Sequence, residues 1–287
     1  MRVLVTRRRC RRDVSDRRVS DSWKQVDQTG DADSFVAYLD DAARRGRDRR
    51  LERLRRLEVG VGDAVLDVGC GAGDLVIDLA SEIAPGVRAV GVDASETMIA
   101  TARDRTAARG VAVEFVVGDA HALRFVSGTF DAVHCTRVLQ HLDDPGLAMR
   151  EMARVLKPGG RLVVSEPDWD AFVLASDDIS IARAVRDAMG AALRQPDVGR
   201  RLRSLAAAAG LHQVEFSIDA LLPLSTLEAA IQAFDLRARL NEATALGTVE
   251  PEAALRWWQG LERDDQDGIF TLAVIACQLI AQKPSNG

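Results

Sequence analysis

The chain has 287 residues, of which 47% are hydrophobic and 28% charged, and its formal net charge is −5. This composition is ordinary for a globular protein, and the negative charge argues against general nucleic-acid binding. A membrane-spanning helix needs about eighteen or more consecutive apolar residues. The best candidate, 269–281, is shorter and contains Gln278, so no membrane association is expected.

The four cysteines (Cys10, Cys70, Cys135 and Cys277) lie far apart without C-x-x-C spacing. This pattern predicts neither a disulfide framework nor a zinc site, and it fits a reducing cytoplasm. No carboxylate cluster with the spacing of a hard-cation site is found either, so we expect no metal. Residues 1–20 are rich in arginine and poor in apolar residues, which predicts a disordered extension rather than a secretory signal.

The segment 21–62 is predicted to be helical, with helices at 34–44 and 47–58. The second helix has leucines at every third position, which indicates one buried face. Basic residues cluster between Arg44 and Arg56, but acidic residues are interspersed among them. We therefore interpret this cluster as a solvated helix face.

From residue 63 onward short apolar runs alternate with amphipathic stretches, which predicts a parallel sheet with helices on both faces. The predicted strands are 64–68, 88–92, 113–117, 130–134 and 161–165. The predicted helices run from about 73 to 83, from a Ser95 cap to Arg109, and from an Asp144 cap to Lys157.

The remainder of the domain 63–287 is less regular. Predicted helices are 178–194, 197–209, 227–246 and 251–263, and predicted strands are 213–219 and 269–282. Together these elements give an α/β fold with a doubly wound, mostly parallel seven-stranded sheet. Two insertions, about 170–195 and 220–266, should emerge at the carboxyl ends of the strands and form a lid over a substrate pocket. Alternatively, they pack against a second subunit of a homodimer.

A glycine-rich turn follows the first predicted strand, with the pattern D-x-G-x-G-x-G (Asp67, Gly69, Gly71 and Gly73). Glycines permit close approach of the backbone to a ligand. The dinucleotide fingerprint G-x-G-x-x-G does not fit, because Asp74 or Val76 occupies the third glycine position. An acid two residues before the first glycine would also repel a pyrophosphate. Asp67 suits a ligand with a cationic group, which favours an amino-acid nucleoside over NAD.

Four further motifs follow in order: Asp93 after the second strand, Gly118-Asp119-Ala120 after the third, Phe130-Asp131-Ala132-Val133 as the fourth, and 156–164 as a turn into the fifth. With the glycine turn, this set resembles class I S-adenosylmethionine-dependent methyltransferases. It is most similar to the branch that contains the ubiquinone and menaquinone methyltransferases. The resemblance implies a Rossmann-like methyltransferase fold, S-adenosylmethionine as cofactor and a small organic acceptor, as in bacterial specialised metabolism.

The resemblance also implies a cofactor site. Asp67 would accept from the ammonium group, although an acid there can instead cap the following helix, and Asp93 would accept from both ribose hydroxyls. The other implied cofactor residues are Gly69, Gly71, Gly73, Ala94, Met98, Asp119, Ala120, His121 and Thr136. Met98 can equally be a core residue, and His121 an exposed loop residue.

The transferred methyl group should emerge near Thr136, after the fourth strand. His141 is the candidate base, or else a residue that orients its loop. Arg137 would orient an anionic acceptor or form a plain salt bridge, and Asp168 would polarise the acceptor. The candidate pocket residues are Tyr38, Glu166 and Trp169.

Other classes of function fit less well. The chain lacks the D/N-P-P-Y element of adenine methyltransferases after the fourth strand. An NAD-dependent oxidoreductase would keep Asp93 but fails at Asp67 and at the third glycine. A protein that binds the cofactor and catalyses a non-methylating reaction would have the same cofactor motifs, so this alternative stays open.

Overall fold

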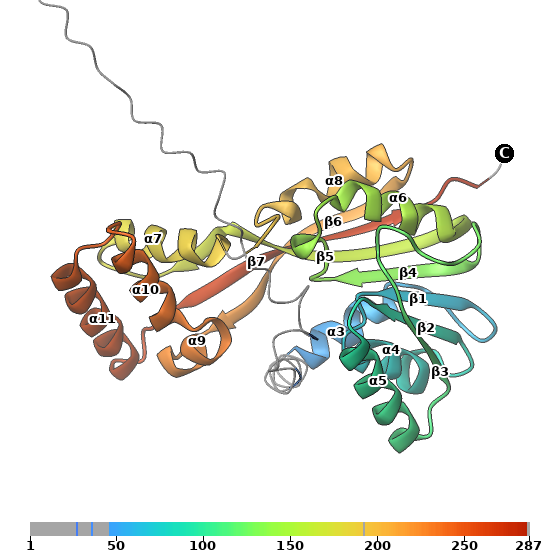
Figure 1. Ribbon diagram of the computed structural model, residues 1–287, viewed down its shortest axis with the longest axis horizontal. Coiled ribbons are helices and arrows are strands. Elements are labelled where there is room, and N and C mark those ends of the chain that lie inside the picture. Colours follow the sequence, from blue (N-terminus) through green and yellow to red (C-terminus); the bar gives the residue numbers. More distant parts are fainter. Residues whose placement is uncertain (1–26, 28–35, 37–45, 192, 286–287) are drawn as a thin grey trace, which may run out of the picture.

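The computed structural model describes residues 27, 36, 46–191 and 193–285, and its elements are labelled in Figure 1. The predicted extension 1–20, Tyr38 and nearly all of the predicted helix 34–44 lie outside the described residues.

A seven-stranded sheet forms the centre of the described chain, in the order β3-β2-β1-β4-β5-β7-β6. The pairs among β1 to β5 are parallel, and β7 is antiparallel to both β5 and β6. This confirms the predicted doubly wound, mostly parallel α/β sheet. The strands are β1 (Ala64–Val68), β2 (Arg88–Asp93), β3 (Val113–Val117), β4 (Phe130–Thr136), β5 (Leu156–Leu174), β6 (His212–Leu224) and β7 (Leu272–Gln282).

The strand order reverses between β1 and β4. From the central strand β1, the next two strands are added outward to β3, and the chain then returns to form β4 on the other side of β1. Ligands of open α/β sheets bind at such a switch point, beyond the carboxyl ends of the strands. The fold therefore places the glycine turn after β1 where a ligand is expected.

Helices cover both faces of the sheet. They are α3 (Arg47–Arg55), α4 (Asp74–Asp78), the π-helical η3 (Leu79–Ile83), α5 (Glu96–Arg109), η4 (Leu139–His141), α6 (Pro145–Val155), α7 (Ile179–Gly190), α8 (Val198–Ala208), α9 (Leu227–Phe234), α10 (Leu236–Ala245) and α11 (Pro251–Gln266). The predicted caps are confirmed: the side chain of Ser95 accepts from the Met98 amide, and that of Asp144 from the Leu147 amide.

Two apolar cores hold these helices on the sheet. One contains Met149 of α6 and Leu202 of α8. The other contains Leu54 of α3, Ile77 of α4 and Ile99 of α5. Successive side chains of a strand point to opposite faces of the sheet. Because helices cover both faces, every residue of β1 is buried.

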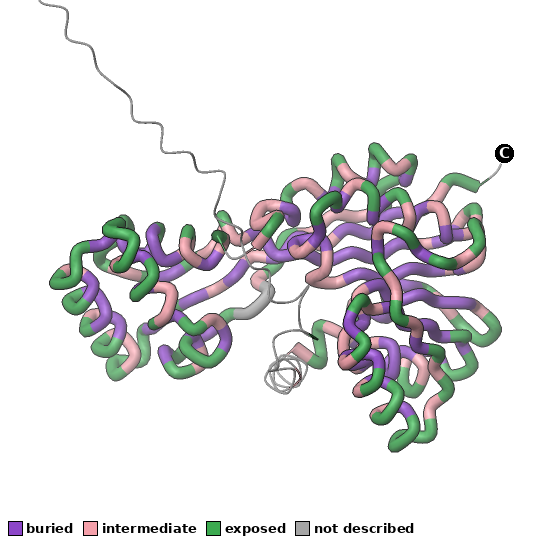
Figure 2. The backbone as a smooth tube through the Cα atoms, in the orientation of Figure 1, coloured by how far each residue is buried: buried purple, intermediate pink, exposed green. Residues whose placement is uncertain are grey.

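β5, β6 and β7 extend beyond the other strands and carry the helices α7, α9, α10 and α11, which we name the helical lobe (Figure 1). The lobe has its own buried core, including Val185, Leu236 and Leu261 (Figure 2). Because β5 and β6 reach the lobe with their carboxyl ends, the lobe stands at the ligand-binding end of the sheet.

Two predictions about this region are wrong in detail. The single helix predicted at 227–246 is divided at Asp235, which has φ 48° and caps α10 through its side chain. The fifth strand, predicted at 161–165, is much longer, because β7 pairs with β5 as far as Leu174. The antiparallel ladder with β7 continues through Pro167, which pairs with Ala276.

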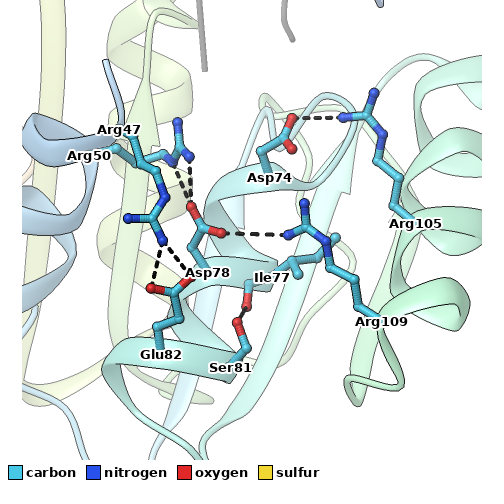
Figure 3. Close-up of polar contacts among 9 residues, drawn as sticks. All are labelled: Arg47, Arg50, Asp74, Ile77, Asp78, Ser81, Glu82, Arg105 and Arg109. Carbon is cyan, nitrogen blue, oxygen red and sulfur yellow. Dashed lines mark hydrogen bonds and ion pairs between the residues drawn. The ribbon is translucent and has the colours of Figure 1, made fainter. Parts of the chain in front are cut away.

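The arginines of α3 hold this helix against α4 (Figure 3). Asp78 is buried, and it accepts from Nε and Nη2 of Arg50 at 3.0 and 2.7 Å. Arg109 of α5 reaches the same carboxylate at 3.6 Å. The side chain of Arg50 is only 12% exposed. The interpretation of the basic cluster as a solvated face is therefore wrong for this arginine.

The Asp78 pair gives a prediction about stability. Asp78→Ala leaves Arg50 without its buried counter-ion, so the free energy of unfolding should fall by about 3 kcal/mol. Urea unfolding measures this change. Glu82→Ala is the matched control, because Glu82 pairs with Arg47 in an exposed position and its loss should change little. Equal destabilisation by both variants would contradict the prediction.

Candidate functional site

The glycine turn is held tightly by its neighbours. Gly69 and Gly73 have φ of 71° and 83°, in the left-handed region that favours glycine. A Cβ at Gly69 would collide with Val138 after β4, and one at Gly73 would lie 2.9 Å from Phe115 of β3. Glycine is therefore required at these two positions because the turn packs directly against neighbouring side chains of the protein.

Asp93 ties the glycine turn to the end of β2. Its Oδ2 accepts from the Gly71 amide at 2.8 Å, and its Oδ1 accepts from the Ser95 amide at 3.0 Å. Burial raises the pKa of the Asp93 carboxyl in spite of these hydrogen bonds, and the negative charge of Asp67 adds to the rise. The two carboxylates therefore lie close enough to repel each other.

Asp67 is part of a buried hydrogen-bond network of three side chains, Asp67, His134 and Thr136. Asp67 and His134 are register partners across β1 and β4, and the Oδ1 of Asp67 lies 2.8 Å from the Nδ1 of His134. The other ring nitrogen, Nε2, lies 3.0 Å from the hydroxyl of Thr136. His134 is fully buried, so its ring orientation is determined by these two partners. This network links Asp67, the expected acceptor for the ammonium group, to Thr136, near which methyl transfer is expected.

The residues expected around the adenine follow β2 and β3. Met98 is buried in the protein, Ala94 is exposed, and Ala120 is buried. His121 bridges two loops: its Nδ1 lies 2.7 Å from Asp119, and its Nε2 accepts from the Asp144 amide at 3.4 Å. Both nitrogens of His121 thus have protein partners, which gives this histidine a role in loop geometry.

Glu166 of β5 organises the loop after β4. Its Oε1 accepts from the amides of Val138 and Leu139, both at 2.8 Å, while its Oε2 is buried without a partner in the described chain. Burial raises the pKa of the Glu166 carboxyl to about 7, although the backbone donors and Arg137 oppose the rise. Arg137 itself has φ 58° and donates its amide to the carbonyl of Ser165.

The other predicted catalytic and pocket residues contact protein groups. Asp168 is buried and forms a two-pronged pair with Arg200 of α8, with N–O distances of 2.5 and 2.6 Å. Trp169 donates from Nε1 to Gln140 at 2.8 Å. Its ring also packs edge to face on Phe234 of α9, so it connects the loop after β4 to the helical lobe.

His141 lies in η4, half-buried, with its amide bonded to the carbonyl of Val138. It is therefore on the same loop as Arg137, and this loop directly follows Thr136, the last residue of β4. This location agrees with the expected neighbourhood of the transfer region, and the role of His141 stays a prediction.

Sequence reasoning missed three residues that the structure brings to this end of the sheet. His134 could have been noticed as a polar residue within a buried apolar strand. Arg53 of α3 was included in the basic cluster, and its Nε is in fact buried. Asp27 accepts from the Ser95 hydroxyl at 2.7 Å and from the amides of Glu96 and Thr97 at 3.0 and 3.1 Å. No local pattern predicts that contact with the start of α5.

Asp67 and Asp93 bring negative charge to the carboxyl ends of β1 and β2. None of the described ion pairs joins a lysine or arginine to Asp67 or Asp93. Two carboxylates that repel each other favour a bound cation. The residues present therefore fit a nucleoside that carries an ammonium and a sulfonium group, and they do not suit a pyrophosphate.

Several known proteins are similar to this chain. Residues 60–195 match the model of a methyltransferase domain. An uncharacterized 37.1 kDa protein in transposon Tn4556 of Streptomyces fradiae is 35% identical over 85% of this chain and 71% of its own length. A demethylmenaquinone methyltransferase of Thermus thermophilus is 45% identical over 38% of this chain, and the match spans about half of that relative (51%).

A solved structure, that of the [4+2]-cyclase SpnF, has the same fold, with a TM-score of 0.53 and 24% identity over 83% of this chain and 81% of that one. The fold, the acids at the strand ends and these relatives define the class: the chain belongs to the class I S-adenosylmethionine-dependent methyltransferases. In the described part of the chain, no three metal-ligating side chains converge. Nor does any described helix combine the length and hydropathy that crossing a bilayer requires.

The hydrogen-bond network at Asp67 gives a prediction about cofactor affinity. His134→Val removes the donor that orients Asp67, and losing a hydrogen bond to a charged group should raise the Kd for S-adenosylhomocysteine about tenfold. His134→Asn keeps a donor near the position of Nδ1 and should recover most of the affinity. Isothermal titration calorimetry gives both values. Unchanged affinity in the valine variant would show that Asp67 does not depend on His134.

Glu166 gives a prediction about pH. Its pKa is raised from 4.5 in the unfolded chain to about 7 in the fold, so the native state holds a proton that the unfolded state has lost between these values. Stability should therefore fall as pH rises from about 5 to about 7, by about 3 kcal/mol. Glu166→Gln cannot titrate and should lose this decline. Urea unfolding of both proteins at several pH values tests it, and parallel pH profiles would be the contrary result.

Proposed function

We propose that this protein transfers the methyl group of S-adenosylmethionine to a small organic acceptor bound between the loop after β4 and the helical lobe. The observation that carries the proposal is the pair of acids at the switch point of the sheet, Asp67 and Asp93, which no described lysine or arginine pairs with. When bound, S-adenosylmethionine supplies an electrophilic methyl group on a sulfonium.

Each residue of the crevice has a proposed role in binding. Asp67 has one oxygen oriented by His134 and offers the other to the cofactor's ammonium group. Asp93 accepts from the ribose hydroxyls, and its bonds to Gly71 and Ser95 hold the carboxylate in position. On the adenine side, Asp119 accepts from the amino group and the amide of Ala120 donates to the ring.

Positioning supplies much of the rate in this proposal. An in-line displacement is accelerated mainly by holding the two reactants in the reactive geometry. Glu166 holds the loop that carries Arg137 and directly follows Thr136, and Asp168 holds α8 through Arg200. Asp168 thus acts as a positioning residue, while His141 is the candidate base for an acceptor that keeps its proton at neutral pH.

The helical lobe is the proposed lid. Trp169 stands at the junction between the lobe and the loop after β4, where its ring can form one wall of the acceptor pocket. The largely apolar core of the lobe and its aromatic residues favour an acceptor with an apolar or aromatic body. Natural products made by bacterial specialised metabolism are acceptors of this kind.

A non-methylating reaction is the second candidate. SpnF, whose fold this chain shares, is described as a [4+2]-cyclase, so this fold also supports a reaction other than methylation. The two functions differ in one measurable respect. Transfer of isotopically labelled methyl groups into an acceptor, with release of S-adenosylhomocysteine, supports the first. Conversion of the acceptor without label incorporation supports the second.

The cofactor assignment gives a direct test. Asp93→Ala should raise the Kd for S-adenosylmethionine about tenfold or more, because a charge-assisted pair with the ribose is worth about 1.5–3 kcal/mol. Calorimetric titration measures it. Asp104→Ala is the control: it removes an exposed carboxylate from α5, and this variant should bind S-adenosylmethionine as tightly as the wild type does. Micromolar binding of NAD without binding of S-adenosylmethionine would overturn the proposal.

A further inference from the structure

The side chains of Asp67, His134 and Thr136 lie in the order carboxylate, imidazole, hydroxyl. Oδ1 of Asp67 lies 2.8 Å from Nδ1 of His134, and Nε2 of the same ring lies 3.0 Å from Oγ1 of Thr136. An imidazole within hydrogen-bond reach of a hydroxyl and held by a third group is the general arrangement of a base that removes the hydroxyl proton. Orientation of Asp67 requires only one of the two nitrogens of His134, so the contact of Nε2 with Thr136 needs a further reason.

The hydrogen bonds of this network have a defined direction. A carboxylate only accepts, so the ring nitrogen that faces Asp67, Nδ1, carries a hydrogen. When the ring is neutral, Nε2 then has a free lone pair, and the hydroxyl of Thr136 is its donor. His134 is fully buried, so the partner at Nδ1 determines which nitrogen is left to accept. The neutral ring is therefore oriented to take up a proton at Nε2.

Of the three side chains in the network, Thr136 is the one that a bound molecule meets. Asp67 and His134 are buried, whereas Thr136, the last residue of β4, is half-buried. β4 ends beside β1 at the switch point of the sheet, and the loop that follows it is held by Glu166. A group bound at the carboxyl ends of β1 and β4 therefore reaches His134 through the hydroxyl of Thr136.

The charges at the switch point favour a proton on His134 once methyl transfer has taken place. No described lysine or arginine pairs with Asp67 or Asp93. Methyl transfer converts a sulfonium into a neutral thioether, so these acids lose one positive charge in their surroundings. A proton taken up by His134 restores a positive charge beside Asp67, whose Oδ1 lies 2.8 Å from the ring.

We infer that Asp67, His134 and Thr136 form a proton relay and that the methyl acceptor is a hydroxyl group, which holds its proton at neutral pH and needs a base. The inference rests on the proposed function, since it names the acceptor class of the same site. As the acceptor oxygen bonds to the methyl carbon, its proton passes to Oγ1 of Thr136, and the Thr136 proton passes to Nε2 of His134. The electron pair of the broken C–S bond stays on sulfur. The proton on His134 later returns through Thr136 to water.

The first measurement locates the hydrogen on His134 in the protein saturated with S-adenosylhomocysteine. Nitrogen-15 NMR distinguishes a ring nitrogen that carries hydrogen from one with a free lone pair, and comparison with His134→Asn identifies the signals. At neutral pH the ring should be neutral, with its hydrogen on Nδ1. Hydrogen on Nε2, or on both nitrogens, would overturn the inference, because neither form accepts the proton of Thr136.

The second measurement follows the transfer of isotopically labelled methyl groups to phenol and to 4-nitrophenol in slightly alkaline buffer. There 4-nitrophenol is largely ionised and needs no base, whereas phenol keeps its proton. Thr136→Val removes the hydroxyl and keeps the shape, so it should slow transfer to phenol about a hundredfold or more and change transfer to 4-nitrophenol little. Thr136→Ser should keep most of the rate with both. Equal effects of Thr136→Val on the two acceptors would overturn the inference.

His134→Asn separates the relay from cofactor binding. It keeps a donor toward Asp67 but supplies no base, so it should bind S-adenosylhomocysteine nearly as tightly as the wild type and lose transfer to phenol as Thr136→Val does. Thr129→Val is the matched control, since Thr129 directly precedes β4 at the opposite end of the strand. Loss of transfer to phenol in His141→Asn but not in Thr136→Val would assign the base to His141 and overturn the inference.

The products separate failure of this inference from failure of the proposed function. Methylation of phenol should give anisole. A methyl group on a ring carbon, or transfer to aniline or thiophenol but to neither phenol, would overturn the assignment of a hydroxyl acceptor. Failure of S-adenosylhomocysteine to bind, or binding without methyl transfer to any of these probes, would instead contradict the proposed function.

Discussion

The mutual repulsion of two carboxylates, Asp67 and Asp93, is the constraint on which the site depends. Parallel strands place both acids at one edge of the sheet, and burial raises the free energy of holding two negative charges there. The two carboxylates are held by the Gly71 and Ser95 amides and by the ring of His134. These donors orient the acids without cancelling their charge. The crevice therefore keeps its preference for a cation.

The two sides of the switch point hold acids in different surroundings. On the β1–β2 side, no described lysine or arginine pairs with Asp67 or Asp93, and Asp67 is bonded to His134. On the β4–β5 side, Glu166 accepts from the Val138 amide, and burial raises the pKa of its carboxyl to about 7. The acids of the first side attract a cationic ligand before any specific contact forms.

The fold was largely predictable from local signals. Glycine, proline and capping residues mark the ends of the elements between 63 and 165, and their positions agree with the structure within a few residues. The errors occur where partners far away in the sequence decide. β5 is long because β7 pairs with it, and the helix predicted at 227–246 is broken because Asp235 adopts a left-handed conformation between two packed helices. Residue patterns do not contain those partners.

The sequence by itself determined the order of strands and helices, the glycine turn and the acids at the strand ends, because these depend on spacing within a few residues. Only the tertiary structure decided which side chains share the site. His134 meets Asp67 across two strands, Glu166 of β5 holds the loop after β4, and Asp168 is held by Arg200. The physical reason is that a charge acts through space: burial and the nearest partner determine its role, and both come from segments distant along the chain.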